Sequence, residues 1–556
     1  MAPSITPVSV LETRSVLNHV SLKPSERKEY IFRSKLPDIE LPTTGITLAD
    51  YTFEKVADNL DRAALIDGPT GKEWTYRETR LLSKKVAAGL SKLGIVKGDV
   101  IALLLPNCAD FVFCLLGSAT LGSVVTTCNP SYTEREVVKQ LLSCKTKLVV
   151  TQASLFDKVR NLGLIVVTTD SPPEGALPIS VLFDNDENEA PIVKIYSDEV
   201  VCLPFSSGTS GLPKGVMLTH SSMICNVAQQ VEGENPSQYL TRDDVIMCLL
   251  PMFHIYSLSC IILCSLRRGC TIIIMPKYTI LQLLEMIQKH RVSMLPVVPP
   301  IVLGIAKSPI VEQYDLTSVK KVMSAAAPLG KELSEKFQVK LPYAAVGQGY
   351  GMTEAGVAVS ICLNFSKNAL PVKAGSGGTI LPNTEAKIVD PETGVSYSYN
   401  QPGELCIRGP QVMKGYLNDP ESTAKTIDKD GWLHTGDVAV IDEDEEVFIV
   451  DRVKEIIKVK GFQVPPAELE ALLLSHPFIA DAGVVSRKDE AAGEVPVAFV
   501  VRTQDAAVTE VDVKDFISKQ VVYYKRLHEV YFVESIPWSR AGKILRRELR
   551  QNNLGV

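Results

Sequence analysis

The sequence predicts an α/β protein with a large N-terminal domain of parallel and mixed sheets flanked by helices, followed by a small, mobile α+β lid domain. Its 556 residues, 46% of them hydrophobic, exceed what one hydrophobic core usually supports. Short β-rich runs such as 100–105 and 271–275 alternate with amphipathic helical patterns such as 78–93 and 281–290, as in α/β folds.

A polar break, Asp451-Arg452-Val453-Lys454, separates this alternation from a second one in the remaining C-terminal residues. Domain boundaries fall in such polar segments. We therefore expect a flexible segment over residues 1–30, a large domain over 31–450 and a lid domain over 451–556.

Charge and composition exclude several classes of protein. A net charge of −6 provides no basic field for a nucleic-acid backbone. The apolar run 258–266 ends at Arg267-Arg268, well short of the roughly 20 residues that span a bilayer. The chain ends in Leu554-Gly555-Val556 rather than in the peroxisomal signal Ser-Lys-Leu. We expect a cytoplasmic protein with no membrane, nucleic-acid or obligate protein partner.

The twelve cysteines are expected to be reduced core residues. They show no Cys-x-x-Cys spacing, and the seven histidines do not cluster with them along the chain. The sequence therefore predicts neither a disulfide framework nor a zinc site.

The sharpest local signal is a loop rich in hydroxyls and glycine that follows the apolar run 200–203. It reads Ser206-Ser207-Gly208-Thr209-Ser210-Gly211-Leu212-Pro213-Lys214-Gly215. Glycines and hydroxyls let backbone N–H groups approach phosphate oxygens, and Lys214 supplies a positive charge. The loop fails the Walker A pattern, because Pro213 and Gly215 stand where Gly and Ser or Thr are required. It predicts a polyphosphate site unlike that of a kinase or GTPase; a flexible surface loop is the alternative.

Five further motifs follow this loop in a fixed order. They are Pro251–Tyr256 (PMFHIY), Gly347–Glu354 (GQGYGMTE), Gly403–Gly409 (GELCIRG), Gly431–Asp437 (GWLHTGD) and Gly542-Lys543. With this ordered set the chain resembles the adenylate-forming superfamily and, within it, the plant 4-coumarate:CoA ligases. The resemblance implies a luciferase-like fold and a ligase of phenylpropanoid metabolism. Such an enzyme uses ATP and Mg²⁺ to convert a hydroxycinnamate into an acyl-adenylate, and then transfers the acyl group to coenzyme A.

The resemblance also assigns roles to single residues. Lys543 would bridge the acyl carboxylate and the α-phosphate, His254 would orient the carboxylate, and Glu354 would hold Mg²⁺. In the lid, Lys460 and Gly461 would complete the CoA channel after a rotation, with Gln463 close by. ATP or AMP would be bound by Ser206, Ser207, Gly208, Thr209, Ser210, Gly211, Lys214, Gln348, Gly349, Tyr350, Thr353, Asp437, Arg452, Lys454 and Lys458.

The same resemblance maps an acyl pocket onto twelve positions. These are Ile255, Tyr256, Ser259, Val297, Met323, Ala325, Ala326, Gly349, Gly351, Val357, Ala358 and Val359. Some depart from the usual plant pattern: Met323 replaces Lys, and Val357-Ala358-Val359 replaces Pro-Val-Leu. One methyl group discriminates by only about 1–3 kcal/mol, so the preferred ring substitution stays open. Near the C-terminus, Trp538 replaces a usual Lys.

Three alternatives share parts of this pattern. A medium-chain fatty acid or oxylipin-precursor acyl-CoA synthetase would keep every ATP residue and differ in the pocket. A luciferase-like oxygenase or a carrier-loading adenylation module is disfavoured because Lys460-Gly461 is retained. A catalytically silent binding protein would be expected to lose functional residues, whereas Lys214, Glu354, Asp437, Arg452 and Lys543 are all present.

Overall fold

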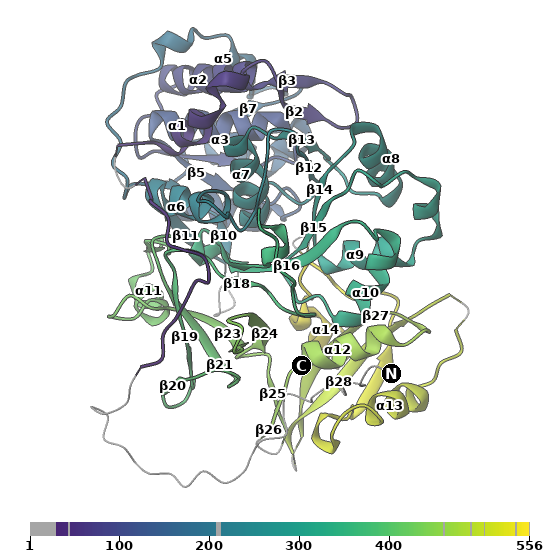
Figure 1. The fold of residues 1–556 in the computed structure, drawn as a ribbon. Coiled ribbons are helices and arrows are strands. Elements are labelled where there is room, and N and C mark those ends of the chain that lie inside the picture. Colours follow the sequence, from purple (N-terminus) through teal and green to yellow (C-terminus); the bar gives the residue numbers. More distant parts are fainter. Residues whose placement is uncertain are drawn as a thin grey trace.

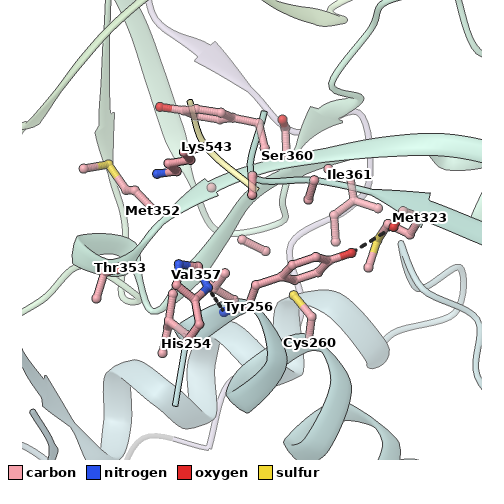
Figure 2. A pocket seen from close by; sticks show the side chains of 17 residues that line it. His254, Tyr256, Cys260, Met323, Met352, Thr353, Val357, Ser360, Ile361 and Lys543 are labelled. Atoms are coloured by element: carbon pink, nitrogen blue, oxygen red, sulfur yellow. Dashed lines mark hydrogen bonds between the residues drawn. The ribbon is translucent and has the colours of Figure 1, made fainter. Parts of the chain in front are cut away.

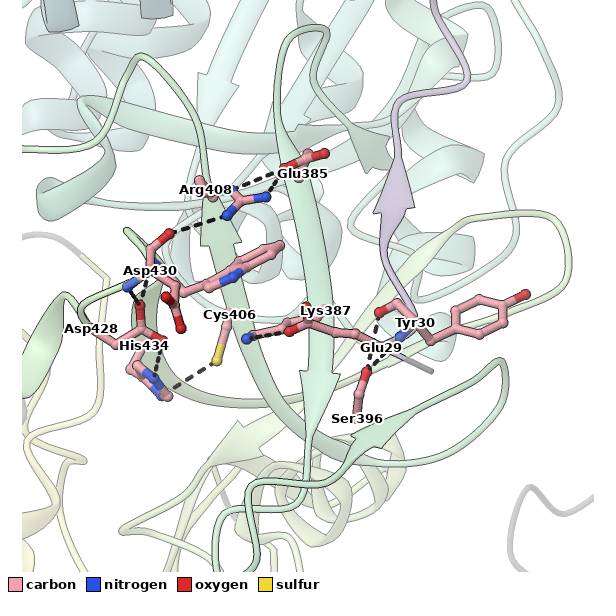
Figure 3. Close-up of polar contacts among 11 residues, drawn as sticks. Glu29, Tyr30, Glu385, Lys387, Ser396, Cys406, Arg408, Asp428, Asp430 and His434 are labelled. Atoms are coloured by element: carbon pink, nitrogen blue, oxygen red, sulfur yellow. Dashed lines mark hydrogen bonds and ion pairs between the residues drawn. The ribbon is translucent and has the colours of Figure 1, made fainter. Parts of the chain in front are cut away.

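The structure is a computed structural model that describes residues 29–42, 45–206, 213–459, 462–489, 492–504, 506–539 and 542–554 (Figure 1). Of the segment expected to be flexible, residues 1–28 lie outside the described residues. Glu29 and Tyr30 are described: Glu29 pairs with Lys387, and the Tyr30 N–H donates to Ser396 Oγ at 3.1 Å (Figure 3).

Two large sheets in the described residues are built mainly from parallel strands. The first has the order β10 (Phe205–Ser206), β11 (Lys214–Thr219), β9 (Val200–Cys202), β5 (Val124–Thr127), β4 (Val100–Leu103), β6 (Leu148–Thr151), β7 (Ile165–Thr168), β8 (Leu177–Pro178), with β22 (Gly415–Tyr416) beside β11. The second has the order β18 (Thr379–Ile380), β17 (Val357–Ile361), β16 (Ala345–Met352), β15 (Lys321–Ser324), β14 (Met294–Val297), β12 (Val245–Cys248), β13 (Thr271–Ile274), β2 (Ala63–Asp67), β3 (Glu73–Thr75).

The other two sheets are smaller. An antiparallel sheet has the order β1 (Phe32–Arg33), β19 (Glu385–Val389), β21 (Gly403–Arg408), β23 (Leu433–Ile441), β24 (Val447–Arg452), with β20 (Ser396–Tyr397) beside β19. The C-terminal sheet has the order β26 (Phe462–Val464), β25 (Ile457–Val459), β28 (Gly493–Arg502), β27 (Ile479–Asp489), with β29 (Glu529–Phe532) beside β28.

Helices separate and cover these sheets (Figure 1). The α-helices are α1 (Leu48–Phe53), α2 (Tyr76–Lys92), α3 (Ala109–Leu121), α4 (Glu134–Ser143), α5 (Ser180–Phe183), α6 (His220–Val231), α7 (Cys264–Arg268), α8 (Ile280–His290), α9 (Pro299–Lys307), α10 (Lys331–Lys340), α11 (Pro420–Thr426), α12 (Pro466–Ser475), α13 (Glu510–Ser518) and α14 (Arg546–Leu554). A π-helix, Tyr256–Leu263, precedes α7. No helix among the described residues is long and apolar enough to cross a membrane.

The elements confirm the predicted fold class, and local sequence explains their limits. The runs predicted as strands form β4 and β13, and the helical patterns form α2 and α8. A capping box of Thr75 and Glu78 starts α2. Gly122, with φ of 75°, ends α3.

One core joins the first three sheets, and separate clusters lie under the C-terminal sheet. Ile457, Leu469, Val484 and Val500 belong to one of these C-terminal clusters and are fully buried. In Figure 1 this C-terminal part lies against α9 and α10.

Candidate active site

A cavity opens where β16 ends and turns back into β17. Ligands of parallel sheets bind at the carboxyl ends of strands, and the motif 347–354 supplies that end of β16. Figure 2 shows Lys543 on one side of the cavity, opposite His254 and Tyr256. The lining residues are His254, Ile255, Tyr256, Cys260, Met323, Ala325, Ala326, Gly349, Tyr350, Gly351, Met352, Thr353, Val357, Ala358, Ser360, Ile361 and Lys543.

The charge state of the two predicted catalytic residues follows from burial. Loss of water around Lys543 lowers the pKa of its ammonium to about 8, with a further lowering by Arg452 and opposition from Asp437 and Glu354. Burial also lowers the pKa of His254 to about 4, assisted by the charge of Lys543. His254 Nδ1 accepts the Tyr256 N–H at 3.3 Å, as a neutral imidazole does. The site therefore pairs a neutral histidine with a lysine whose pKa lies well below its usual value.

This pairing predicts the pH dependence of the reaction. Lys543 is protonated below its pKa, so kcat/KM for acyl activation is expected to fall as pH rises through about 8. His254 is uncharged above about pH 4, so no acidic limb near pH 6.5 should come from it. A pH profile of kcat/KM for the acid substrate measures both; a limb near 6.5 that disappears in His254→Ala would contradict the neutral histidine.

Asp437 lies opposite Arg452 in the antiparallel pair of β23 and β24. Tyr350 OH donates to Asp437 Oδ2 at 2.6 Å, and Arg452 Nε lies 3.5 Å from Oδ1. Burial raises the pKa of Asp437, and Arg452 and Tyr350 oppose that rise. Asp437 is thus a partly buried carboxylate that is hydrogen-bonded to Tyr350, a residue of the cavity lining.

Glu404 stabilises the turn before Asp437. It also belongs to a cluster of side chains that the sequence did not predict. Its Oε1 accepts the Gly436 N–H at 3.0 Å, and its Oε2 lies 2.9 Å from His434 Nδ1. Cys406 Sγ is 3.4 Å from the same nitrogen (Figure 3), so a histidine, a cysteine and a carboxylate do cluster in space. The expectation of no such cluster was wrong because residues about 30 positions apart meet across β21 and β23. All twelve cysteines are free thiols, as predicted.

A second buried carboxylate, Glu354, lies beside the base of the hydroxyl-rich loop. Ser206 Oγ and Tyr416 OH both donate to its Oε1, at 2.6 and 3.0 Å. Among the described residues no hydrogen bond reaches its Oε2. Ser206 and Lys214 pair across β10 and β11, which brings the two ends of the loop together. Lys214 Nζ donates to Ser422 Oγ at 2.6 Å and lies 3.6 Å from Asp419.

Most predicted acyl-pocket positions line the cavity, but three do not. Ser259, Val297 and Val359 are fully buried and absent from its lining. Gln348 also lies outside it, because its side chain accepts the Leu329 N–H at 2.6 Å and donates to the Leu329 carbonyl at 3.3 Å.

Two C-terminal residues that were predicted to bind ATP lie away from the cavity. Lys454 and Lys458 line a separate open cleft with Lys488 and Glu494. Gln463 is described only as backbone in β26. Ser207, Gly208, Thr209, Ser210, Gly211, Lys460 and Gly461 lie outside the described residues.

Four residues that line the cavity were not predicted from the sequence: Cys260, Met352, Ser360 and Ile361. Cys260 follows Tyr256 by one helical turn, so helical spacing could have identified it. Ser360 and Ile361 reach the cavity through the pairing of β17 with β16, which no local pattern encodes.

Comparison with known proteins identifies the class. A family model for AMP-binding enzymes matches residues 52–417, and one for the AMP-binding enzyme C-terminal domain matches residues 468–543. The chain therefore belongs to the AMP-binding enzyme family. It is 56% identical to 4-coumarate--CoA ligase 2 of Solanum tuberosum over 96% of this chain and 98% of that one. It is 55% identical to 4-coumarate--CoA ligase of Pinus taeda over 94% and 98%. Within the family it thus groups with the plant 4-coumarate--CoA ligases.

Solved structures share the fold of this chain. ATP-bound MatB from Rhodopseudomonas palustris is 27% identical and superposes with a TM-score of 0.82 over 91% of this chain and 98% of that chain. Apo MatB, with the same identity and coverage, gives a TM-score of 0.73.

Proposed function

We propose that this chain is an ATP-dependent hydroxycinnamate:CoA ligase that forms an acyl-adenylate and then the CoA thioester. This proposal rests on an apolar cavity. Lys543 is the one charged residue among the described residues that line it. Such a cavity accepts the apolar body of an acid and leaves its carboxylate at the ammonium. Identity above 50% to 4-coumarate--CoA ligases over nearly the whole chain supports the substrate class.

The reaction has two balanced steps. In the first, a carboxylate oxygen of the acid bonds to the α-phosphorus of ATP while the bond from that phosphorus to the bridging oxygen breaks, and pyrophosphate leaves. In the second, the CoA thiol gives its proton to solvent and its sulfur bonds to the acyl carbon, while the bond from that carbon to the phosphate oxygen breaks and AMP leaves. Lys543 brings the two anions of the first step together and offsets the negative charge that accumulates between them. Neutral His254 orients the carboxylate without repelling Lys543.

The two buried or partly buried carboxylates, Asp437 and Glu354, have separate roles. Asp437 accepts hydrogen bonds from the ribose hydroxyls, with Arg452 beside it. Glu354 suits Mg²⁺, because it is a buried carboxylate whose Oε2 receives no hydrogen bond from the described residues. Mg²⁺ at Glu354 would neutralise the phosphate charge. The loop at 206–211, Lys214 and Thr353 bind the phosphates, and Gly349 and Tyr350 contact the rest of the nucleotide.

Residues 451–556 act as a mobile lid on the domain formed by residues 31–450. The arrangement with Lys543 in the cavity serves the first step, and the better superposition on ATP-bound than on apo MatB supports this. A rotation near Arg452 then withdraws Lys543 and brings Lys460-Gly461 and Gln463 to the CoA channel, with Lys454 and Lys458 turning from their present cleft.

The inner end of the cavity favours a weakly polar ring. Tyr256 OH donates its proton to the Met323 carbonyl at 2.9 Å, so this hydroxyl is left only as an acceptor for a ring hydroxyl (Figure 2). Met323, Cys260 and Ile361 add no charge. An aromatic acid with no more than a small polar ring substituent fits these surroundings.

The experiment is thioester formation by the purified protein with ATP, Mg²⁺ and CoA. It compares 4-coumarate, caffeate, ferulate, cinnamate and sinapate with hexanoate and laurate. We expect hydroxycinnamates to have the highest kcat/KM, at least about 10-fold above the aliphatic acids. Activity restricted to aliphatic acids would keep the chemistry and overturn the substrate class.

A further inference from the structure

The segment that presents Lys543 is fastened to β27 by a tryptophan. Trp538 pairs with Ile544 across the segment. The Ser539 N–H donates to the Lys543 carbonyl at 2.7 Å, and the Lys543 N–H donates to Ser539 Oγ at 3.0 Å. Trp538 Nε1–H donates to Asp481 Oδ2 at 2.7 Å. The departure of Trp538 from the usual lysine therefore has a structural partner.

The start of β27 also accepts hydrogen bonds from a residue of α9, outside the C-terminal part. Lys307, the last residue of α9, donates from Nζ to the carbonyls of Ile479 at 2.9 Å and Ala480 at 3.1 Å. These two residues immediately precede Asp481. A charged donor on two carbonyls is stronger than a neutral hydrogen bond, and it is geometrically specific.

The opposite end of α9 contacts the same segment. Val298, which caps α9, packs so closely on Gly542 that a Cβ there would lie 2.6 Å from the Val298 Cβ. Both ends of one helix thus contact the C-terminal part: one next to Lys543, the other at the strand that holds Trp538.

We propose that Lys307 and Trp538 are positioning residues that dock the C-terminal part on α9 and so hold Lys543 in the cavity during adenylation. Their hydrogen bonds join α9, residues 479–481 and the Lys543 segment in one continuous chain. The hydrogen bonds of Lys307 join α9 to the C-terminal part, so a rotation of the lid must break them. This inference rests on the proposed role of Lys543 in the first step.

The test separates the two half-reactions in full-length protein. Lys307→Met removes the crossing donor, and Trp538→Phe removes the indole N–H while keeping an aromatic ring. We expect acid-dependent ATP–pyrophosphate exchange to fall about 3–10-fold in each variant, because Lys307→Met loses a charged donor to two carbonyls and Trp538→Phe loses one neutral donor. Thioester formation from a synthetic acyl-adenylate and CoA should stay within about 2-fold of wild type.

Two further variants make the result specific. Lys336→Met removes a nearby exposed charge from α10, and Lys336 makes no hydrogen bond among the described residues, so both half-reactions should be unchanged. Lys307→Arg keeps a charged donor and should recover most of the exchange rate. Equal loss of both half-reactions, or unchanged exchange in Lys307→Met, would overturn the docking proposal. Wild-type protein inactive with every acid would instead overturn the proposed function.

Discussion

Lys543→Ala is expected to lower acid-dependent ATP–pyrophosphate exchange by at least about 10²-fold, the range seen when a group that stabilises transition-state charge is removed. Lys543 is the one charged residue among the described residues that line the cavity, and the charges of Asp437 and Glu354 both favour its ammonium form. Without it, the acyl carboxylate and the α-phosphate would meet with no cation between them. Thioester formation from a preformed acyl-adenylate should be largely kept, because that step does not join two anions.

The comparison needs a variant that changes charge without touching the cavity. Arg547→Ala, at an exposed position of α14, removes a cation four residues away and should leave both half-reactions near wild type. Comparable losses of exchange and thioester formation in Lys543→Ala would show a general role in folding or lid closure. That result would remove Lys543 from the adenylation step.

Local patterns were enough to predict the fold class. The β-rich runs at 100–105 and 271–275 and the helical pattern at 78–93 carry their own periodicity, and each forms the expected element. The motif 347–354 was found because it is one continuous segment, and β16 places it at the cavity. Such features need no knowledge of which strand pairs with which.

The sequence did not predict which distant segments of the chain contact each other. His434 meets Cys406 and Glu404 only because β21 and β23 are neighbours. Gln348 turns to the backbone of Leu329, 19 residues away in the chain, rather than to the cavity. The sequence shows that Trp538 departs from the usual lysine, but its partner Asp481 lies 57 residues away, on β27. In each case the contact depends on tertiary packing rather than on the segment itself.

Gly351→Ala is expected to reduce kcat/KM for the acid by about 10²-fold, because displacing reacting groups by about 1 Å has that effect. An added Cβ would lie 1.7 Å from the Val357 carbonyl oxygen and 2.7 Å from its carbon, so the backbone of the cavity wall must move. Val357 has little freedom to move: its φ is 137°, a region that β-branched residues rarely adopt, and the β16–β17 pairing shifts register at Gly351. We also expect the free energy of unfolding to fall by about 1–3 kcal/mol.

Gly349→Ala is the matched control, since it adds the same methyl group to the same cavity. Its Cβ would meet the Ser360 carbonyl oxygen at 3.5 Å and Met323 Sδ at 3.8 Å, which are ordinary contacts. Gly349→Ala should therefore keep its unfolding midpoint in urea and raise KM for bulky acids through lost space alone. If Gly351→Ala unfolds at the wild-type urea concentration and shows only this rise in KM, cavity volume rather than the fixed β16–β17 backbone determines activity. A lower unfolding midpoint together with a lower kcat would instead locate the constraint in that backbone, because a filled cavity alone changes acid binding without weakening the fold.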